Sequence, residues 1–220
     1  MPVVGYILTV LIAYLLGSVP TGFLVAKTRG VDIRSLGSGN IGATNVFRVL
    51  GKSAGAFVFL ADAAKGYLAV LVIAKVFCAL FDPAAGPTAR DWFDICGGAA
   101  AILGHNFSCW LRFKGGKGIA TSAGVLVALV TVPLLIILGV WIIVFALTRY
   151  VSLASVSAAF ALPFAAWAVG KDSTLILVTA ALAALAIYRH KANLRRLING
   201  TENRITLKKS LPADIPKPTT

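Results

Sequence analysis

Long apolar stretches, separated by short polar segments, restrict the fold of this 220-residue chain more than any other feature. A helix that crosses a lipid bilayer needs about 20 mostly apolar residues. Stretches of roughly this length recur along the chain, and they comprise residues 3–26, 53–80, 92–111, 119–147, 150–169 and 173–188. The sequence therefore predicts an all-α, polytopic membrane protein.

The composition supports this prediction. Hydrophobic residues make up 58% of the chain and charged residues 13%. In a typical soluble domain about 45–50% of residues are apolar and about 25% are charged. We expect one membrane-embedded domain over residues 1–204, followed by a proline-rich, disordered tail at 205–220. The net charge of +13 comes from basic residues beside apolar stretches, as in cytoplasmic loops, so no nucleic-acid partner is expected.

The stretch 119–147 is long enough for one tilted helix or for two short helices, and the distribution of charge favours two. Basic residues cluster at 112–117 and again from residue 189 onward, and both clusters should face the cytoplasm. An even number of crossings must then separate them. Two crossings come from 150–169 and 173–188, so 119–147 must supply two more, turning near Pro133. The prediction is seven transmembrane helices with the N-terminus outside and the C-terminus in the cytoplasm; a hairpin that dips part-way is the alternative.

The first of three polar clusters spans residues 35–48 and is rich in glycine. Glycine lets the backbone turn and approach a ligand closely, and successive N–H groups in such a loop form an anion site. Arg48 adds a planar cation suited to phosphate. The alternative, a flexible linker, has no need for two asparagines and an arginine. We therefore expect a phosphate site that includes Gly37, Ser38, Gly39, Asn40 and Asn45.

The second and third clusters carry more cations. Residues 104–118 contain His105 and then Lys114-Gly115-Gly116-Lys117, just before an apolar stretch whose helix N-terminus can bind an anion. Residues 189–204 contain His190 and Asn193, which share a face if the last helix continues, and Glu202, which can anchor this arm to a cation. The alternatives are a positive-inside anchor for the second cluster and simple attraction to the membrane surface for the third.

Two further features lie within the apolar stretches. Asp62 and Lys65 are three residues apart in one stretch and are expected to pair, because an unpaired charge there is costly; their role is either structural or functional. Ser152 and Ser155 lie near the start of another stretch. Ser155 either donates to a bound oxygen or packs between helices.

Three segments of the chain resemble a known family. LGSGNIGATNVFR (36–48), GHNF with FKGGKGIAT (104–121), and RHKANLRRL with GTE (189–202) are similar to the signature motifs of the bacterial acyl-phosphate:glycerol-3-phosphate acyltransferases. GSVPTG, ADAAKG and RYVSLAS also look like that family. The resemblance runs from about residue 5 to residue 204. It departs from the pattern at Ser108-Cys109 and at Ala192, which affects local packing more than charge.

The resemblance implies a multi-pass enzyme of the bacterial inner membrane, with its active site facing the cytoplasm. It would transfer a fatty acyl group from acyl phosphate to the sn-1 hydroxyl of glycerol 3-phosphate, giving lysophosphatidic acid and phosphate. The first motif is tied to catalysis through Ser38 and Arg48, and the second to glycerol phosphate through its lysines and glycines. The third supplies His190 and Asn193, together with a structurally important Glu202.

The residues are consistent with direct attack of the substrate hydroxyl on the acyl carbonyl, because acyl phosphate is already activated and no convincing covalent nucleophile is present. Ser38, Asn40 or Asn45 would stabilise the oxyanion. His190 would act as base or as phosphate donor, although a substrate phosphate oxygen can equally take the proton. No metal or cofactor is expected. An organophosphate transporter and a lipid-binding scaffold remain the alternatives.

Overall fold

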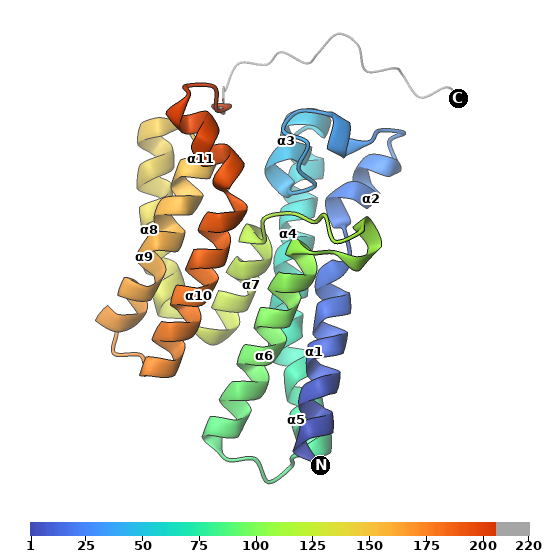
Figure 1. The fold of residues 1–220 in the computed structure, drawn as a ribbon, viewed down its shortest axis with the longest axis vertical. Helices are drawn as coiled ribbons and strands as arrows, with labels where there is room; N and C mark the ends of the chain where they lie inside the picture. The colour runs from blue at the N-terminus through green and yellow to red at the C-terminus, as the bar shows by residue number, and fades with distance from the viewer. Residues whose placement is uncertain (206–220) are drawn as a thin grey trace.

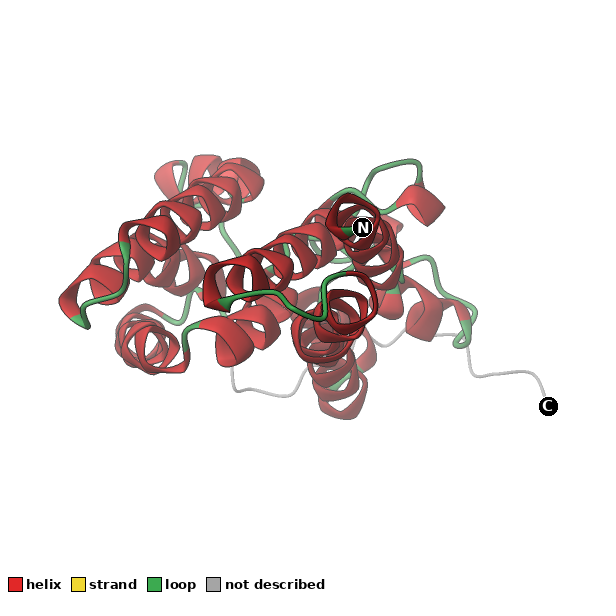
Figure 2. Cartoon of the chain, turned by 90° about the horizontal axis from the view of Figure 1, so that it is seen from below, coloured by secondary structure: helices red, strands yellow, loops and turns green. Residues whose placement is uncertain are grey.

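The computed structural model describes residues 1–205, and within that range it consists of helices and loops without strands (Figure 1, Figure 2). The tail expected at 205–220 lies outside the described residues except for Ile205. The helices are α1 (Pro2–Ser18), α2 (Thr21–Lys27), α3 (Ala43–Leu50), α4 (Lys52–Leu68), α5 (Lys75–Phe81), α6 (Pro87–Asn106), α7 (Ile119–Leu129), α8 (Thr131–Thr148), α9 (Val151–Ala168), α10 (Ser173–Arg189) and α11 (Lys191–Ile198). A π-helical turn, η2 (Ala69–Ala74), joins α4 to α5, and the 3-10 turns η1 (Ile33–Ser35) and η3 (Cys109–Leu111) lie in loops.

The helices confirm an integral membrane protein. Among the described residues, four helical stretches are long and apolar enough to cross a bilayer. They are Pro2–Lys27 (α1 with α2), Lys52–Phe81 (α4, η2 and α5), Thr131–Thr148 (α8) and Val151–Ala168 (α9). The pair α10 and α11 adds a fifth if this broken helix, bent by 57°, counts as one span. The helical character is therefore confirmed for the stretches expected from hydrophobicity.

One expected boundary was wrong. The span predicted at 92–111 is α6, which begins at Pro87, where the missing N–H costs nothing in a first helical turn, and ends at Asn106. Residues 107–118 form a loop instead, in which the Ser108 hydroxyl donates to the Ser18 carbonyl at 2.6 Å. The first span is interrupted between α1 and α2 at Val19-Pro20, because proline cannot continue the hydrogen-bond ladder.

The stretch 119–147 forms two helices, as predicted, but the break is not at Pro133. It lies at Val130, whose φ of −146° and ψ of 64° leave the helical region. Pro133 is in the first turn of α8, where a proline is tolerated. In Figure 1 the chain descends along α7 and returns along α8. With 11 residues, α7 is about 16 Å long.

Close helix contacts in the first half of the chain depend on glycine. The helix α1 packs against α6, and a Cβ on Gly17 would lie 2.1 Å from the Ala101 carbonyl oxygen. The same holds for Gly104 against Tyr14, at 2.2 Å. Small residues allow helix backbones to approach in a bilayer, where van der Waals contact replaces the hydrophobic effect as the driving force. In the second half of the chain, α8 packs on α9 and α9 on α10.

Candidate active site

A groove of about 800 Å³ lies between α3 and α4 on one side and α8 to α11 on the other. All three polar clusters of the sequence contribute to its lining, through Asn40, Lys117 and His190 among others. Figure 1 shows the corresponding segments in the half of the molecule away from the N-terminus. Of the expected site residues, the structure brings the following to the groove: Ser38, Asn40, Asn45, Arg48, Asp62, His105, Lys117, Ser155, His190, Asn193 and Glu202.

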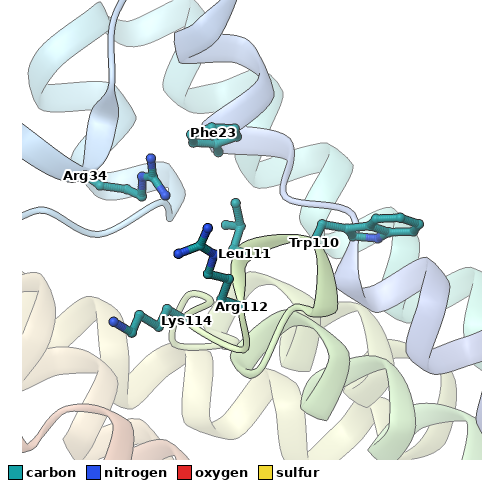
Figure 3. Close-up of a pocket in the computed structure, with 6 residues that line it drawn as sticks. All are labelled: Phe23, Arg34, Trp110, Leu111, Arg112 and Lys114. Atoms are coloured by element: carbon teal, nitrogen blue, oxygen red, sulfur yellow. The ribbon is translucent and has the colours of Figure 1, made fainter.

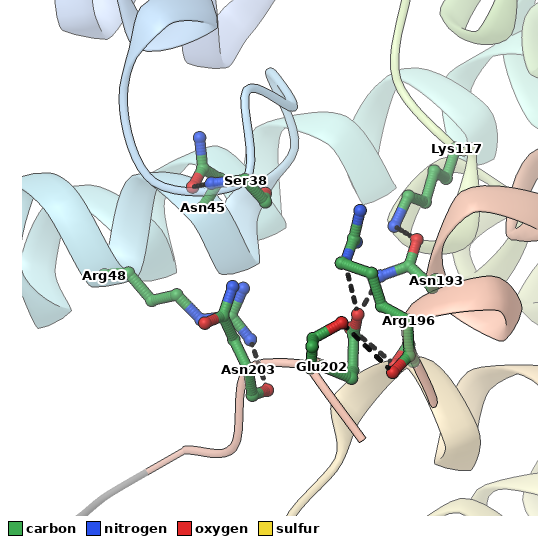
Figure 4. Close-up of polar contacts among 10 residues, drawn as sticks. Ser38, Asn45, Arg48, Lys117, Asn193, Arg196, Glu202 and Asn203 are labelled. Atoms are coloured by element: carbon green, nitrogen blue, oxygen red, sulfur yellow. Dashed lines mark hydrogen bonds and ion pairs between the residues drawn. The ribbon is translucent and has the colours of Figure 1, made fainter. Parts of the chain in front are cut away.

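Asn45 organises the first cluster. Its side chain is buried, accepts the Ser38 N–H at 2.8 Å, and donates to the carbonyls of Leu36 and Asn40 at 3.0 and 2.9 Å (Figure 4). Gly37 has a φ of +58°, and a Cβ there would lie 2.3 Å from the Asn45 Oδ1 atom. Because its amide is fully used inside the loop, Asn45 fits a positioning role better than the oxyanion contact expected from the sequence.

Gly39 and Asn40 complete this loop. Gly39 also has a left-handed φ, of +68°, and a Cβ there would meet the Arg34 carbonyl. Asn40 Oδ1 accepts the Gly42 N–H at 2.8 Å, and its amide nitrogen has no hydrogen-bond partner among the described residues. Asn40 also lines the groove. The two glycines thus shape the turn that presents Ser38 and Asn40.

We expect Asn45→Asp to destabilise the protein by about 1–3 kcal/mol, because the carboxylate cannot donate to the two loop carbonyls. Thermal unfolding of the purified protein measures this. Thr44→Ser is a matched control at the neighbouring, partly exposed position. Equal melting temperatures for Asn45→Asp and Thr44→Ser would contradict the positioning role.

Glu202 ties the third cluster together. One carboxylate oxygen accepts from Asn193 Nδ2 at 2.6 Å and from Ser152 Oγ at 2.8 Å, and the other accepts from Arg196 Nε at 2.7 Å (Figure 4). Burial by itself raises the pKa of Glu202, but the three hydrogen bonds more than offset burial, so the net pKa is lowered. The carboxylate is charged, and the expected pairing of Glu202 with a cation is confirmed.

The segment around Glu202 also reaches the first cluster. The Arg48 guanidinium donates to the Asn203 carbonyl at 3.2 Å (Figure 4). The Arg48 Nε atom is buried and has no hydrogen-bond partner among the described residues. A buried donor without a partner is costly unless a ligand accepts from it. The position of this nitrogen at the groove therefore suits an anion.

Lys117 is the cation that the second cluster contributes to the groove. It donates to Asn193 Oδ1, which positions its ammonium group between the second and third clusters (Figure 4). Burial lowers the pKa of Lys117 to about 8, with the nearby charge of Glu202 opposing this shift and those of Arg196 and Arg48 adding to it. The ammonium group therefore titrates near physiological pH.

The two glycines between the lysines make hydrogen bonds within the protein through both their N–H groups and their carbonyls. The N–H groups of Gly115 and Gly116 donate to the carbonyls of Asn106 and His105, at 3.2 and 3.0 Å. Their carbonyls accept from Arg189, at 3.1 Å and at 2.7 Å. Neither N–H is free for phosphate, so we assign these glycines to the shape of the loop.

Lys114 does not join Lys117. It is exposed and lines a second pocket, together with Arg34 and Arg112 (Figure 3). The two lysines of the 107–118 loop therefore line different cavities: Lys117 lines the groove, and Lys114 lines the second pocket. The expectation that both lysines bind the same phosphate does not fit this geometry.

His190 lies at the break between α10 and α11, so the last helix does not continue as one straight rod. Its Nδ1 atom is 2.8 Å from the Ala186 carbonyl oxygen. Because a carbonyl only accepts, Nδ1 carries the proton. In the neutral imidazole, Nε2 then has a free lone pair, and His190 lines the groove.

A buried polar network closes the floor of the groove. Lys65 Nζ lies 2.8 Å from Asp62 Oδ1, which confirms the expected ion pair. The same ammonium group donates to the Val19 carbonyl at 3.0 Å and lies 2.9 Å from His105 Nδ1. Thr21 donates to Asp62 at 3.0 Å. Since an ammonium group only donates, His105 Nδ1 is the acceptor, and this network joins α2, α4 and α6.

Several helices begin at the groove, which adds to its positive potential. The lining includes Ala43 at the start of α3, Ile119 of α7, Val151 of α9, and His190 immediately before α11. The first N–H groups of a helix have no partner within the helix, and the helix dipole favours an anion there. Arg48 and Lys117 lie among these helix starts, so the groove is suited to phosphate. Among the residues the structure describes, no group of three His, Cys, Asp or Glu side chains could hold a metal ion.

Comparison with known proteins decides the family. The model of the family described as glycerol-3-phosphate acyltransferase matches residues 7–200. The chain belongs to the glycerol-3-phosphate acyltransferase family. It is 46% identical to the curated member from Desulforudis audaxviator, over 95% of this chain and 100% of that one, and 44% identical to the member from Geotalea daltonii, over 87% and 93%.

Solved structures agree with the assignment to the glycerol-3-phosphate acyltransferase family. A crystal structure of PlsY, described as an integral membrane glycerol 3-phosphate acyltransferase in its glycerol 3-phosphate form, has a TM-score of 0.80 at 38% identity. It covers 91% of this chain, and the chain covers 96% of it. The lysophosphatidic acid form of PlsY gives a TM-score of 0.78.

Sequence reasoning missed several residues in and around the groove. Arg189 holds the glycine pair and lies over the Phe107 ring at 5.0 Å, yet nothing in the motif separates it from the other arginines nearby. Thr21 and Trp141 were also missed; the Trp141 indole donates to Ser155 Oγ at 3.2 Å. Ser155 thus accepts a hydrogen bond within the protein and also lines the groove, and both roles expected for it stay predictions.

Proposed function

We propose that this protein transfers a fatty acyl group from acyl phosphate to the sn-1 hydroxyl of glycerol 3-phosphate, releasing lysophosphatidic acid and phosphate. The observation that carries the proposal is a single groove with cations at one part and apolar side chains at another. Arg48 and Lys117 suit two phosphate groups, and the apolar part suits an acyl chain; it includes Phe59, Leu134, Leu138, Trp141 and Phe145.

The reaction needs two anions to meet. Two unit charges about 4 Å apart repel by about 4 kcal/mol at an effective dielectric of about 20. Arg48, Lys117 and the helix N-termini offset this repulsion. The substrate hydroxyl oxygen then forms a bond to the acyl carbon, the bond from that carbon to the phosphate oxygen breaks, and phosphate leaves with the electron pair. Ser38 and Asn40, which line the groove, would stabilise the oxyanion through their side chains.

The hydroxyl proton needs an acceptor. The free Nε2 lone pair of neutral His190 is such an acceptor, since Nδ1 is held on the Ala186 carbonyl. Asn193, which contacts both Lys117 and Glu202, would position the third cluster against the second. A phosphate oxygen of the substrate is the competing acceptor for the same proton.

The two acceptors predict different kinetics for His190→Ala. If His190 is the base, kcat falls by about 100-fold or more, while KM for glycerol 3-phosphate changes little. Steady-state kinetics with the purified protein measures both. Lys191→Ala is the control, because Lys191 is exposed and bonds only the Tyr188 hydroxyl. A change confined to KM would instead assign His190 to phosphate binding.

We also propose the membrane arrangement predicted from the sequence. The protein would cross the bacterial inner membrane seven times, as one catalytic domain over 1–204, with α7 as a half-length crossing and the groove facing the cytoplasm. The basic residues around the groove support this orientation by the positive-inside rule. Lipid is then the surrounding solvent, and the acyl donor enters from the inner leaflet.

Incubation of the purified protein with acyl phosphate and labelled glycerol 3-phosphate tests the function. Labelled lysophosphatidic acid should form, and acyl-CoA in place of acyl phosphate should give none. The main rival, an organophosphate transporter, predicts uptake of label into vesicles without product. Formation of no lysophosphatidic acid from either acyl donor would overturn the proposal.

A further inference from the structure

A second pocket, outside the groove, gathers three cations. It measures about 480 Å³ and is lined by Phe23, Arg34, Trp110, Leu111, Arg112 and Lys114, none of which lines the groove. Figure 3 shows Arg34 and Arg112 pointing toward each other from two segments of the chain, with Lys114 on the same loop as Arg112. We propose that this pocket binds the phosphate of an anionic phospholipid at the membrane surface. We call it the headgroup pocket.

The headgroup pocket has more positive charge than the protein itself neutralises. Arg34 is paired with Asp32 at 2.8 Å, and its guanidinium lies 4.8 Å from the centre of the Phe23 ring. Within residues 1–205, the side chains of Arg112 and Lys114 have no ion pair with a carboxylate. One acid thus faces three cations, which leaves two of them for an anionic ligand.

The backbone is strained in order to place these two cations. Arg112 and Phe113 both adopt left-handed conformations, with φ of 53° and 61°, although neither is glycine. Such conformations cost roughly 1–3 kcal/mol each and persist where the surroundings impose them, commonly at ligand sites. The Phe113 N–H donates to the Ser108 carbonyl at 2.8 Å, which closes the turn. The turn directs Arg112 and Lys114 to one side (Figure 3).

The rim of the headgroup pocket favours a lipid over a free phosphate. Trp110 and Phe113 are each 63% exposed, and the Trp110 ring points away from the three cations (Figure 3). Aromatic side chains concentrate at the level of the lipid headgroups, and each basic residue near an anionic surface contributes about 1 kcal/mol of attraction. A site for free phosphate needs the cations but has no use for exposed aromatic rings beside them.

Native mass spectrometry of the full-length protein, with phosphatidylglycerol or phosphatidylcholine of identical chains, tests the proposal. We expect the double variant Arg112→Gln, Lys114→Gln to retain at least about fivefold less phosphatidylglycerol than the original protein, which corresponds to a loss of about 1 kcal/mol in binding free energy. The control is Lys27→Gln, Arg29→Gln, which removes the same charge from exposed positions in the α2 region and should retain the lipid. The charge-conserving variant Arg112→Lys, Lys114→Arg should also retain it, and melting temperatures establish that all variants fold.

Three results would overturn the proposal. Equal loss of lipid in both glutamine variants would mean general surface attraction. Equal retention of phosphatidylcholine by the original protein would mean that charge is not recognised. Complete displacement of phosphatidylglycerol by inorganic phosphate would mean that the pocket recognises free phosphate rather than a lipid.

Discussion

Lys117→Met should lower kcat/KM for glycerol 3-phosphate by about 1,000-fold. The substitution keeps most of the length of the side chain and removes a positive charge that lines the groove. A charge pair at about 4 Å is worth about 4 kcal/mol at an effective dielectric of about 20, and each 1.4 kcal/mol is about a factor of ten. Steady-state kinetics measures this, with Lys114→Met as the matched control, because Lys114 lies in the headgroup pocket.

The pH dependence gives a second readout for Lys117. Its pKa is lowered to about 8 by burial, so the ammonium group is charged below that pH and neutral above it. We expect kcat/KM to fall as pH rises through about 8. Bound phosphate stabilises the charged form, so the corresponding fall in kcat should occur at higher pH. Lys117→Arg keeps its charge over this range and should lack the alkaline fall; an unchanged profile in that variant would contradict the assignment.

The convergence of the three polar clusters could be predicted from the sequence, because charge and hydrophobicity constrain which segments lie at the same membrane surface. The ion pair of Asp62 with Lys65 followed from the cost of an unpaired charge, and the split of 119–147 followed from the parity of crossings. These are constraints of a whole segment. They do not depend on the torsion of any one residue.

The sequence could not predict that Lys114 and Lys117 line different pockets, because this separation depends on the backbone torsion angles of two residues. The left-handed conformations of Arg112 and Phe113 direct Lys114 out of the groove, and such torsions are unusual for residues other than glycine. Likewise, the assignment of Asn45 to the loop depends on the exact turn of residues 36–45, and that of Arg189 to the glycine pair depends on hydrogen bonds between distant segments. A pattern of residue types identifies hydrogen-bond donors, but it does not predict which acceptors those donors bond in the folded protein.

The contact between α4 and α7 links the stability of the fold to the site. A Cβ on Gly124 would lie 1.9 Å from the Ala63 carbonyl oxygen, and a Cβ on Gly66 would lie 2.2 Å from that of Thr121. Both neighbours are backbone, which cannot rotate away as a side chain can. The two glycines therefore let the helices touch along their backbones, and α7 begins with residues that line the groove.

Gly124→Ala should therefore destabilise the protein by about 1–3 kcal/mol, the usual cost of overpacking, and lower the melting temperature by roughly 2–10 °C. Gly139→Ala is the matched control. Gly139 lies in α8, a Cβ there would have no atom within 4 Å, and alanine is a better helix former than glycine. The gain in helix propensity is common to both variants, so the difference in melting temperature isolates the steric clash. Because α7 must move away from α4, KM for glycerol 3-phosphate should rise in Gly124→Ala alone. Similar melting temperatures and kinetics for the two variants would show that the α4–α7 contact tolerates a methyl group, and the proposed dependence of the groove on this contact would be wrong.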